Sequence, residues 1–200
     1  MRARAVQVRN ELPNQLPNFQ LQYPVADIQT LADEYMDSKE GPEDRKMEAA
    51  GKRINDGDFT LANLKVSYRW KSTRRIGLLA NNSDAEIEQA LKQAIAAVDV
   101  REAIDALTRL DEVGVKTASS ILTAIAPERY TALDFRALAA LGSKNGEHLD
   151  LYVNYLEFCK RTAKQYGVNM RTFDRANWQW SRNKSERESG NKRFHCKTSN

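Results

Sequence analysis

The sequence is poor in the residues that build metal sites and disulfide frameworks. It has two cysteines, Cys159 and Cys196, and two histidines among 200 residues. It contains no Cys-x-x-Cys pair, the spacing typical of structural zinc sites and cysteine-held clusters. We therefore expect no metal and no cofactor, and we expect Cys159 to be a buried thiol.

Long apolar stretches are also missing. No run approaches the ~18 uncharged apolar residues of a membrane-spanning helix. The first ten residues contain arginines but no apolar segment behind them, which does not fit a secretory signal. We expect a protein without a membrane partner that lies inside the cell, in the cytoplasm or, in a prokaryote, with the nucleoid.

There is little net charge outside the last twenty residues. The chain carries 31 Lys and Arg against 27 Asp and Glu, a formal net charge of +4. Residues 181–200 hold six of these bases and two of the acids, which leaves 25 of each in the first 180 residues. A DNA-binding surface on the body therefore has to be a local patch and not a general positive field.

Alternating apolar and polar residues, the pattern of β-strands, are absent, whereas apolar residues at helical spacing recur from Ala26 onward. The chain has 41% hydrophobic and 29% charged residues, as globular proteins do. Its length suits one domain or two small lobes that share a core. We predict an all-α fold over residues 26–181, with an extended segment at 1–25, where three prolines occur, and a disordered basic tail at 182–200.

Several helix bounds can be predicted. Ser83 with Glu86 and Asp99 with Glu102 fit the capping box, in which side chains satisfy the unpaired amides of a first helical turn. The predicted helices begin near 28, 43 and 61, after Ser83, after Asp99, and near 117, 134, 147 and 170.

The clearest local motif is a short connection between two predicted helices, Leu110-Asp111-Glu112-Val113-Gly114-Val115-Lys116-Thr117. Backbone amides at the start of the second helix favour an anion such as phosphate, and Gly114 lets a ligand approach the backbone closely. A short helical hairpin with one glycine is by itself a common connector.

A longer stretch makes this motif more specific. Residues 107–142 read LTRLDEVGVKTASSILTAIAPERYTALDFRALAALG. This stretch resembles the signature of the helix-hairpin-helix DNA glycosylase superfamily, to which endonuclease III and 8-oxoguanine glycosylase belong. In that family a hairpin of the form L-P-G-V-G-x-K-T-A precedes a Pro-containing loop and an Asp at the head of the next helix. The matching residues here are Leu110, Val113, Gly114, Lys116, Thr117, Ala118, Pro127 and Asp134.

Two departures from the family pattern stand out. Glu112 occupies the place of the first hairpin glycine, so a carboxylate is expected near the phosphate grip. The four-cysteine cluster of endonuclease III is missing, which aligns the chain with the cluster-free branches and implies no iron.

The resemblance implies a helical glycosylase-like fold with the hairpin at residues 107–125. It also implies a DNA glycosylase that flips a modified base out of the duplex and excises it, in repair or in attack on modified foreign DNA. Asp134 would stabilise the cationic sugar. Lys116, at the start of a helix, would attack the anomeric carbon as an uncharged amine, form a Schiff base and provide AP-lyase activity. The expected DNA contacts of the hairpin are Val113, Gly114, Val115 and Thr117.

A second basic segment lies upstream of the hairpin. Residues 65–75, KVSYRWKSTRR, contain five bases, two aromatic residues and no acid. Bases interleaved with aromatic rings suit a phosphate clamp beside a stacked or extruded base. The expected phosphate contacts are Arg69, Lys71, Ser72 and Arg74, and the expected base-pocket residues are Tyr68, Trp70 and Trp178.

Each assignment has an alternative. Asp134 could only cap its helix, Lys116 could only hold a phosphate, and Trp70 could belong to the core. The alternative functions are a monofunctional glycosylase and a non-enzymatic helix-hairpin-helix DNA-binding protein. Oxidised purines, oxidised or hypermodified pyrimidines and alkylated purines all remain candidate bases. We expect double-stranded DNA containing a modified base as the partner, and a monomeric protein.

Overall fold

The computed structural model describes residues 18–71, 73–144 and 146–197, with side chains up to residue 189. Within these ranges the protein is helical and has no strand, which confirms the all-α prediction. The elements in chain order are the 3-10 helix η1 (Val25–Asp27), α1 (Ile28–Asp37), α2 (Glu40–Asn55), α3 (Leu61–Lys71), the 3-10 helix η2 (Ile76–Asn81), α4 (Asp84–Ala96), α5 (Val100–Thr108), α6 (Val115–Ile125), α7 (Phe135–Ala140), α8 (Leu149–Gln165) and α9 (Met170–Lys197).

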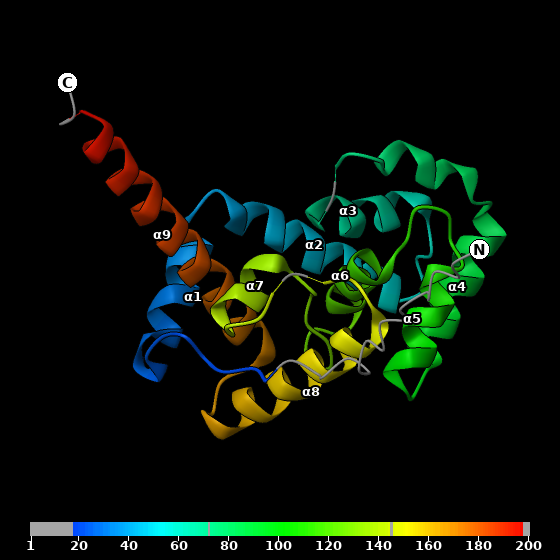
Figure 1. The fold of residues 1–200 in the computed structure, drawn as a ribbon. Helices are drawn as coiled ribbons and strands as arrows, with labels where there is room; N and C mark the ends of the chain where they lie inside the picture. The colour runs from blue at the N-terminus through cyan, green and yellow to red at the C-terminus, as the bar shows by residue number, and fades with distance from the viewer. Residues whose placement is uncertain (1–17, 72, 145, 198–200) are drawn as a thin grey trace, which may run out of the picture.

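The helices form two groups (Figure 1). One group contains α3, α4, α5 and α6, and in the other α1, α7 and α8 all pack against α9. Helix α2 joins the groups because it contacts α1, α3 and α6. The approach of α2 to α6 requires Gly51, since a Cβ at that position would lie 1.8 Å from the carbonyl oxygen of Ala124.

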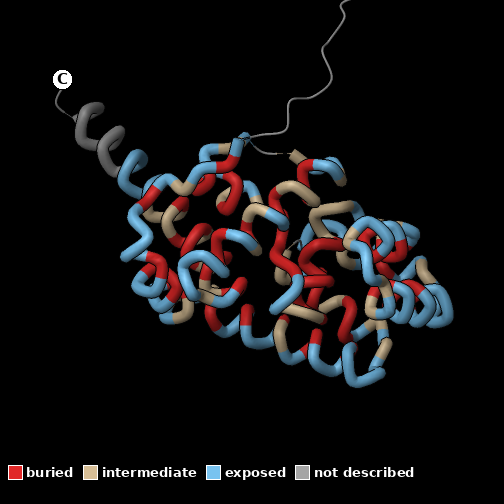
Figure 2. The backbone as a smooth tube through the Cα atoms, turned by 90° about the horizontal axis from the view of Figure 1, so that it is seen from below, coloured by how far each residue is buried: buried red, intermediate tan, exposed pale blue. Residues whose placement is uncertain are grey.

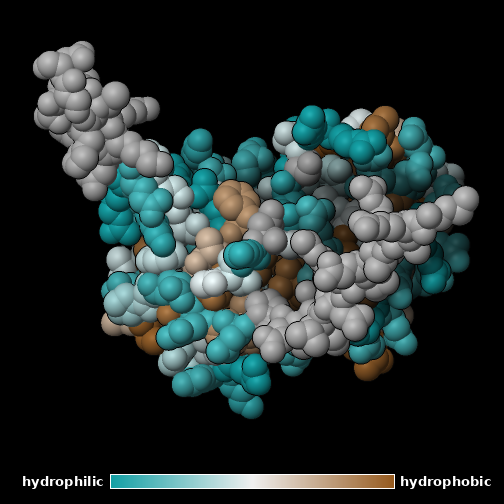
Figure 3. All heavy atoms as spheres, viewed as in Figure 1, coloured by the Kyte–Doolittle hydropathy of each residue, from teal (hydrophilic) through white to brown (hydrophobic). Residues whose placement is uncertain are grey.

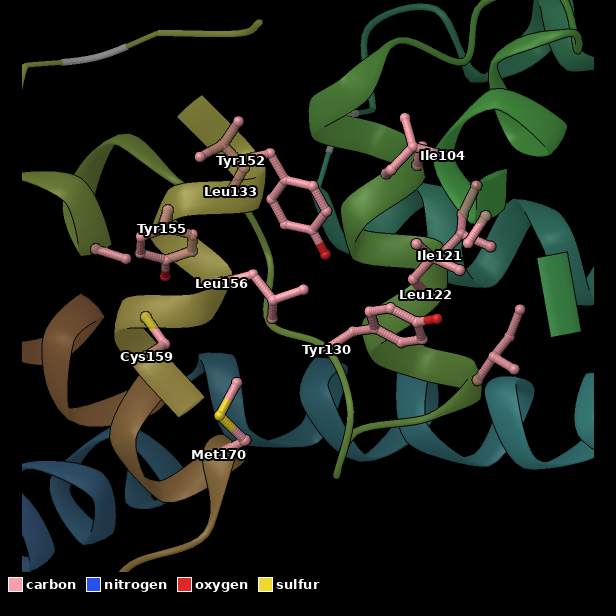
Figure 4. Close-up of a cluster of buried hydrophobic side chains, with 14 of the residues drawn as sticks. Ile104, Ile121, Leu122, Tyr130, Leu133, Tyr152, Tyr155, Leu156, Cys159 and Met170 are labelled. Carbon is pink, nitrogen blue, oxygen red and sulfur yellow. The ribbon is translucent and has the colours of Figure 1, made fainter. Parts of the chain in front are cut away.

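One continuous hydrophobic core runs through both groups. Buried positions face inward on each helix and exposed positions face outward (Figure 2). In the part of the core shown in Figure 4, Tyr152 extends from α8 toward Ile121 and Leu122 of α6. Cys159 of α8 is a buried free thiol, as predicted, and burial raises its pKa well above the ordinary value.

The cap of α4 is as predicted, whereas that of α5 differs in detail. Ser83 and Glu86 form the predicted capping box. Asp99 caps α5, but its carboxylate accepts from the amide of Arg101 at 2.6 Å, whereas in a capping box it would accept from the amide of Glu102.

The last helix does not end near Ser181, where the disordered tail was expected to begin. Helix α9 continues to Lys197. The side chains of residues 184–189 are exposed. Contacts one turn apart support this polar extension: Arg182 lies 2.9 Å from Glu186, and the Ser185 hydroxyl donates to the carbonyl of Ser181. A helix that leaves the body needs no apolar stripe, so the absence of an apolar period did not reveal it.

The surface is mostly hydrophilic on the face shown in Figure 3, where apolar atoms form small, separate patches. Among the described residues, none of the helices is both long enough and apolar enough to cross a membrane.

Candidate active site

The predicted hairpin lies between α5 and α6. Its turn holds Glu112 at a φ of 69°, in the left-handed region where a side chain is strained and glycine is favoured. The glycine of the glycosylase pattern would suit this backbone. An Arg75 nitrogen lies 2.7 Å from the Glu112 carboxylate, and the Tyr68 hydroxyl donates to the Glu112 carbonyl at 3.3 Å. Arg75 therefore neutralises the carboxylate of Glu112, the residue that replaces the first hairpin glycine of the glycosylase pattern.

Helix α6 begins after Gly114, a residue that has no side chain with which to cap the first-turn amides. Gly114 is exposed, and a Cβ built there would meet no atom within 4 Å. Val115 and Thr117 are half-buried, and the Thr117 hydroxyl donates to the Gly114 carbonyl at 3.0 Å. Val113 is buried in the core, so only its backbone is available for contact with a ligand.

Lys116 lies on the second residue of α6, with 22% of its side chain exposed. Its ammonium lies 3.2 Å from the carboxylate of Glu147, whose side chain is 76% exposed. The carbonyl of Lys116 accepts from the hydroxyl of Ser119, and the same hydroxyl accepts from the amide of Leu133 at 2.8 Å. The start of α6 is thus tied to the segment that leads into Asp134.

A pocket of about 150 Å³ lies where α1, α2, α3 and α9 meet the segment before α7. It brings together four residues that were selected from three separate stretches of the sequence: Trp70, Lys71, Asp134 and Trp178. Lys116 is not among the described residues that line it. The remaining lining residues are Tyr35, Glu40, Ala132, Arg171, Asp174 and Arg175.

Asp134 has two roles in the structure. One carboxylate oxygen accepts from the amide of Arg136 at 2.7 Å and caps α7. The other oxygen accepts from the ammonium of Lys71 at the end of α3. The Lys71 and Asp134 side chains are 14% and 15% exposed, so the pair is largely removed from water. Capping fixes the carboxylate and leaves its second oxygen in the pocket.

Two tryptophans contribute to the wall of the pocket. Trp70 is half-buried, and the guanidinium of Arg171 lies 5.3 Å from its ring centroid. Trp178 packs edge-on against Tyr35, with 5.2 Å between ring centroids, and the guanidinium of Arg136 lies 5.1 Å from its ring. These contacts hold both indoles in place at the pocket.

A buried ionic network forms one side of the pocket. Arg171 donates to Asp44 and Asp174, and its Nε donates to Glu48 at 3.4 Å. Arg175 donates to Asp44 at 2.9 Å and to Glu48 at 2.5 Å. Burial opposes the charge of Arg171, but the surrounding carboxylates raise its pKa above the ordinary value. The network clamps α9 onto α2.

No local sequence pattern predicts this network. Arg171, Asp174 and Arg175 follow one another at spacings of three and four residues, and Asp44 and Glu48 are four apart. Such spacing places charges on one helix face, and a charged face is usually exposed to solvent. In the structure the charged face of α9 instead bonds to that of α2, a tertiary contact that local sequence patterns do not predict.

The pKa of Asp174 is raised from its ordinary value of 3.8 to about 6, chiefly by burial. Arg171 opposes this shift, whereas Asp44 and Asp134 reinforce it. The folded protein therefore holds a proton on Asp174 more tightly than the unfolded chain does. The stability that this proton provides is complete below about pH 4 and is lost as the pH rises through about 6.

We expect the free energy of unfolding of the wild type to fall relative to that of Asp174→Asn between pH 4 and pH 6.5. The variant lacks this titration, so the difference between the two proteins isolates it. Urea unfolding at a series of pH values measures the difference. A difference that stays constant or grows with pH would contradict the assigned direction.

Arg69 and Arg74, which were predicted to bind DNA, are not among the residues that line the pocket. Arg69 and Arg74 are exposed on and just after α3. Tyr68 is buried in the core, with its hydroxyl bonded to the hairpin, and is not a pocket residue. Ser72 lies outside the described residues.

No family model matches the chain, and neither a curated protein nor a solved structure matches it. Among the described residues, no group of three or more His, Cys, Asp or Glu is placed to hold a metal ion.

Proposed function

We propose that the protein is a DNA glycosylase with AP-lyase activity, which flips a modified base out of duplex DNA and excises it. One observation carries this proposal: the carboxylate of Asp134 is fixed by its helix-capping bond in a pocket that two tryptophans also line. The glycosylase pattern that contains Asp134 independently places an acid at the head of this helix.

The carboxylate supplies the electrostatics that base excision needs. Breaking the bond between sugar and base leaves positive charge on the sugar, and a preorganised anion stabilises that charge best where water is largely excluded. Asp134 meets both conditions, since its side chain is 15% exposed and its position is set by the N-terminus of α7.

The pocket suits a single flat ring. Its volume of about 150 Å³ is close to that of a cavity that accepts benzene in another protein. Trp70 and Trp178 line the pocket and supply aromatic surface for contact with an extruded base. Glu40, Arg171 and Arg175 add polar groups that can read the edge of the base.

DNA would be held by groups outside the pocket. The N-terminus of α6, next to the exposed Gly114, favours a backbone phosphate. Arg69 and Arg74 are exposed near the end of α3, the helix whose last two residues line the pocket. The first turn of α6 and the basic segment would grip the strand while the extruded base enters the pocket.

The test is to incubate the full chain with a panel of duplexes that each carry one modified base. We expect alkali-labile abasic sites in at least one member of the panel and none in the unmodified duplex. The panel should contain oxidised purines, oxidised and bulky pyrimidines, and alkylated purines. Tight binding to DNA without abasic sites in any duplex would instead indicate a non-enzymatic DNA-binding protein.

A further inference from the structure

The contact between Lys71 and Asp134 bears on which lysine supplies the amine for the lyase step. In the glycosylase pattern the amine belongs to Lys116. Lys116, however, lies at the start of α6 and bonds a carboxylate that is largely in solvent. Lys71 lines the same pocket as Asp134, and its ammonium donates to the Asp134 carboxylate.

We propose that Lys71, and not Lys116, is the nucleophile that attacks C1′ of the sugar. This inference rests on the proposed function. A carboxylate that stabilises the cationic sugar has to lie beside C1′, and a nucleophile has to reach the same carbon. Lys71 is in hydrogen-bond contact with that carboxylate, so both groups meet this requirement at one place.

The ion pair also provides a path for the proton. Lys71 passes a proton to Asp134, which leaves an uncharged amine. As the bond between C1′ and the base breaks, the base takes the bonding electron pair and receives the proton from Asp134. The Asp134 carboxylate is then charged again and faces the cationic sugar.

The covalent step follows from that arrangement. The lone pair of the Lys71 amine forms a bond to C1′. A proton moves from this nitrogen to O4′ as the bond between C1′ and O4′ breaks, which leaves an iminium between Lys71 and C1′. The recharged Asp134 carboxylate then takes a proton from C2′, and the electrons of that C–H bond expel the 3′ phosphate and cut the strand. Borohydride delivers hydride to C1′ of the iminium and turns it into a permanent amine link.

Lys116 has a different role in this arrangement. Its position on the first turn of α6, next to the exposed Gly114, suits contact with a backbone phosphate. Replacement of Lys116 is therefore expected to weaken DNA binding without removing the covalent adduct.

The experiment uses a duplex with a preformed abasic site and sodium borohydride. This probe needs only an amine that reaches C1′, so its result does not depend on which base the protein excises. The proteins are the wild type, Lys71→Gln, Lys71→Arg and Lys116→Gln. Lys71→Arg keeps a cation beside Asp134 but supplies no amine that can form the iminium. It therefore controls for a loss of folding in Lys71→Gln.

Each protein is used at a concentration that saturates the duplex, which for Lys116→Gln is expected to be higher than for the wild type. Under these conditions we expect the wild type and Lys116→Gln to form the adduct and both Lys71 variants to lose it. Mass spectrometry of digested adduct should place the sugar on Lys71. An adduct that survives in both Lys71 variants, an adduct on Lys116, or no adduct with the wild type would overturn the assignment. Base release on the duplex panel without any adduct would refute the role of Lys71 but leave a monofunctional glycosylase standing.

Discussion

Replacing Asp134 by asparagine is expected to lower the rate constant of base release by on the order of 10²- to 10³-fold, the scale of losing one preorganised transition-state contact. Asparagine keeps the size of the side chain and is itself a good N-cap, so α7 should remain intact. What is lost is the negative charge in the pocket. Single-turnover excision measures the effect, because it separates chemistry from product release.

Asp99→Asn is the matched control for this change. Asp99 also caps a helix with its carboxylate, through the amide of Arg101 at 2.6 Å, but it lies on the surface away from the pocket. The control should excise at the wild-type rate. DNA binding by Asp134→Asn should be unchanged or tighter, since a carboxylate near DNA weakens affinity. Equal excision rates for Asp134→Asn and the control would remove Asp134 from the chemistry.

Replacing Arg171 by methionine is expected to cost about 3 to 5 kcal/mol of unfolding free energy, the scale of breaking a buried ion pair from one side. Methionine fills much of the space, but it removes the ion pairs that Arg171 makes with the buried carboxylates of Asp44 and Asp174. The contact of the guanidinium with Trp70 is also lost. The midpoint of urea unfolding measures the change.

Arg101→Met is the control for Arg171→Met. Arg101 pairs with Asp150 at 2.6 Å, but both side chains are about half exposed. A surface pair of this kind contributes about 0 to 1 kcal/mol. Similar destabilisation in the two variants would contradict the view that the network beside the pocket is a buried clamp.

Local features of the fold could be predicted from the sequence because their causes are local. The capping pair of Ser83 and Glu86 and the apolar spacing from Ala26 onward depend on residues within a turn or two of each other. The continuation of α9 beyond Ser181 was not predicted, because it depends in part on a residue far away in the sequence. That extension is polar, and contacts such as that of Asn183 with Glu34 of α1 help to hold it.

The candidate site could be predicted only in part. Asp134, Trp70 and Trp178 were selected as separate residues, and the structure brings them to one pocket. The partner of Asp134 was not foreseen, since Lys71 was expected to hold a phosphate. The two residues are 63 positions apart, and no spacing rule connects the end of α3 with the start of α7. The same limit applies to the contact of α2 with α9 through Arg171.

Cleavage of the bond between the sugar and a modified base would release that base as a free small molecule. The most direct measurement is mass spectrometry of the small molecules released when the full chain acts on the panel of modified duplexes. We expect one modified base to appear free in solution with the wild type and to be almost absent with Asp134→Asn. DNA that is bound or cut without release of any free base would show that the protein is not a glycosylase, and equal release by the variant would show that Asp134 takes no part in excision.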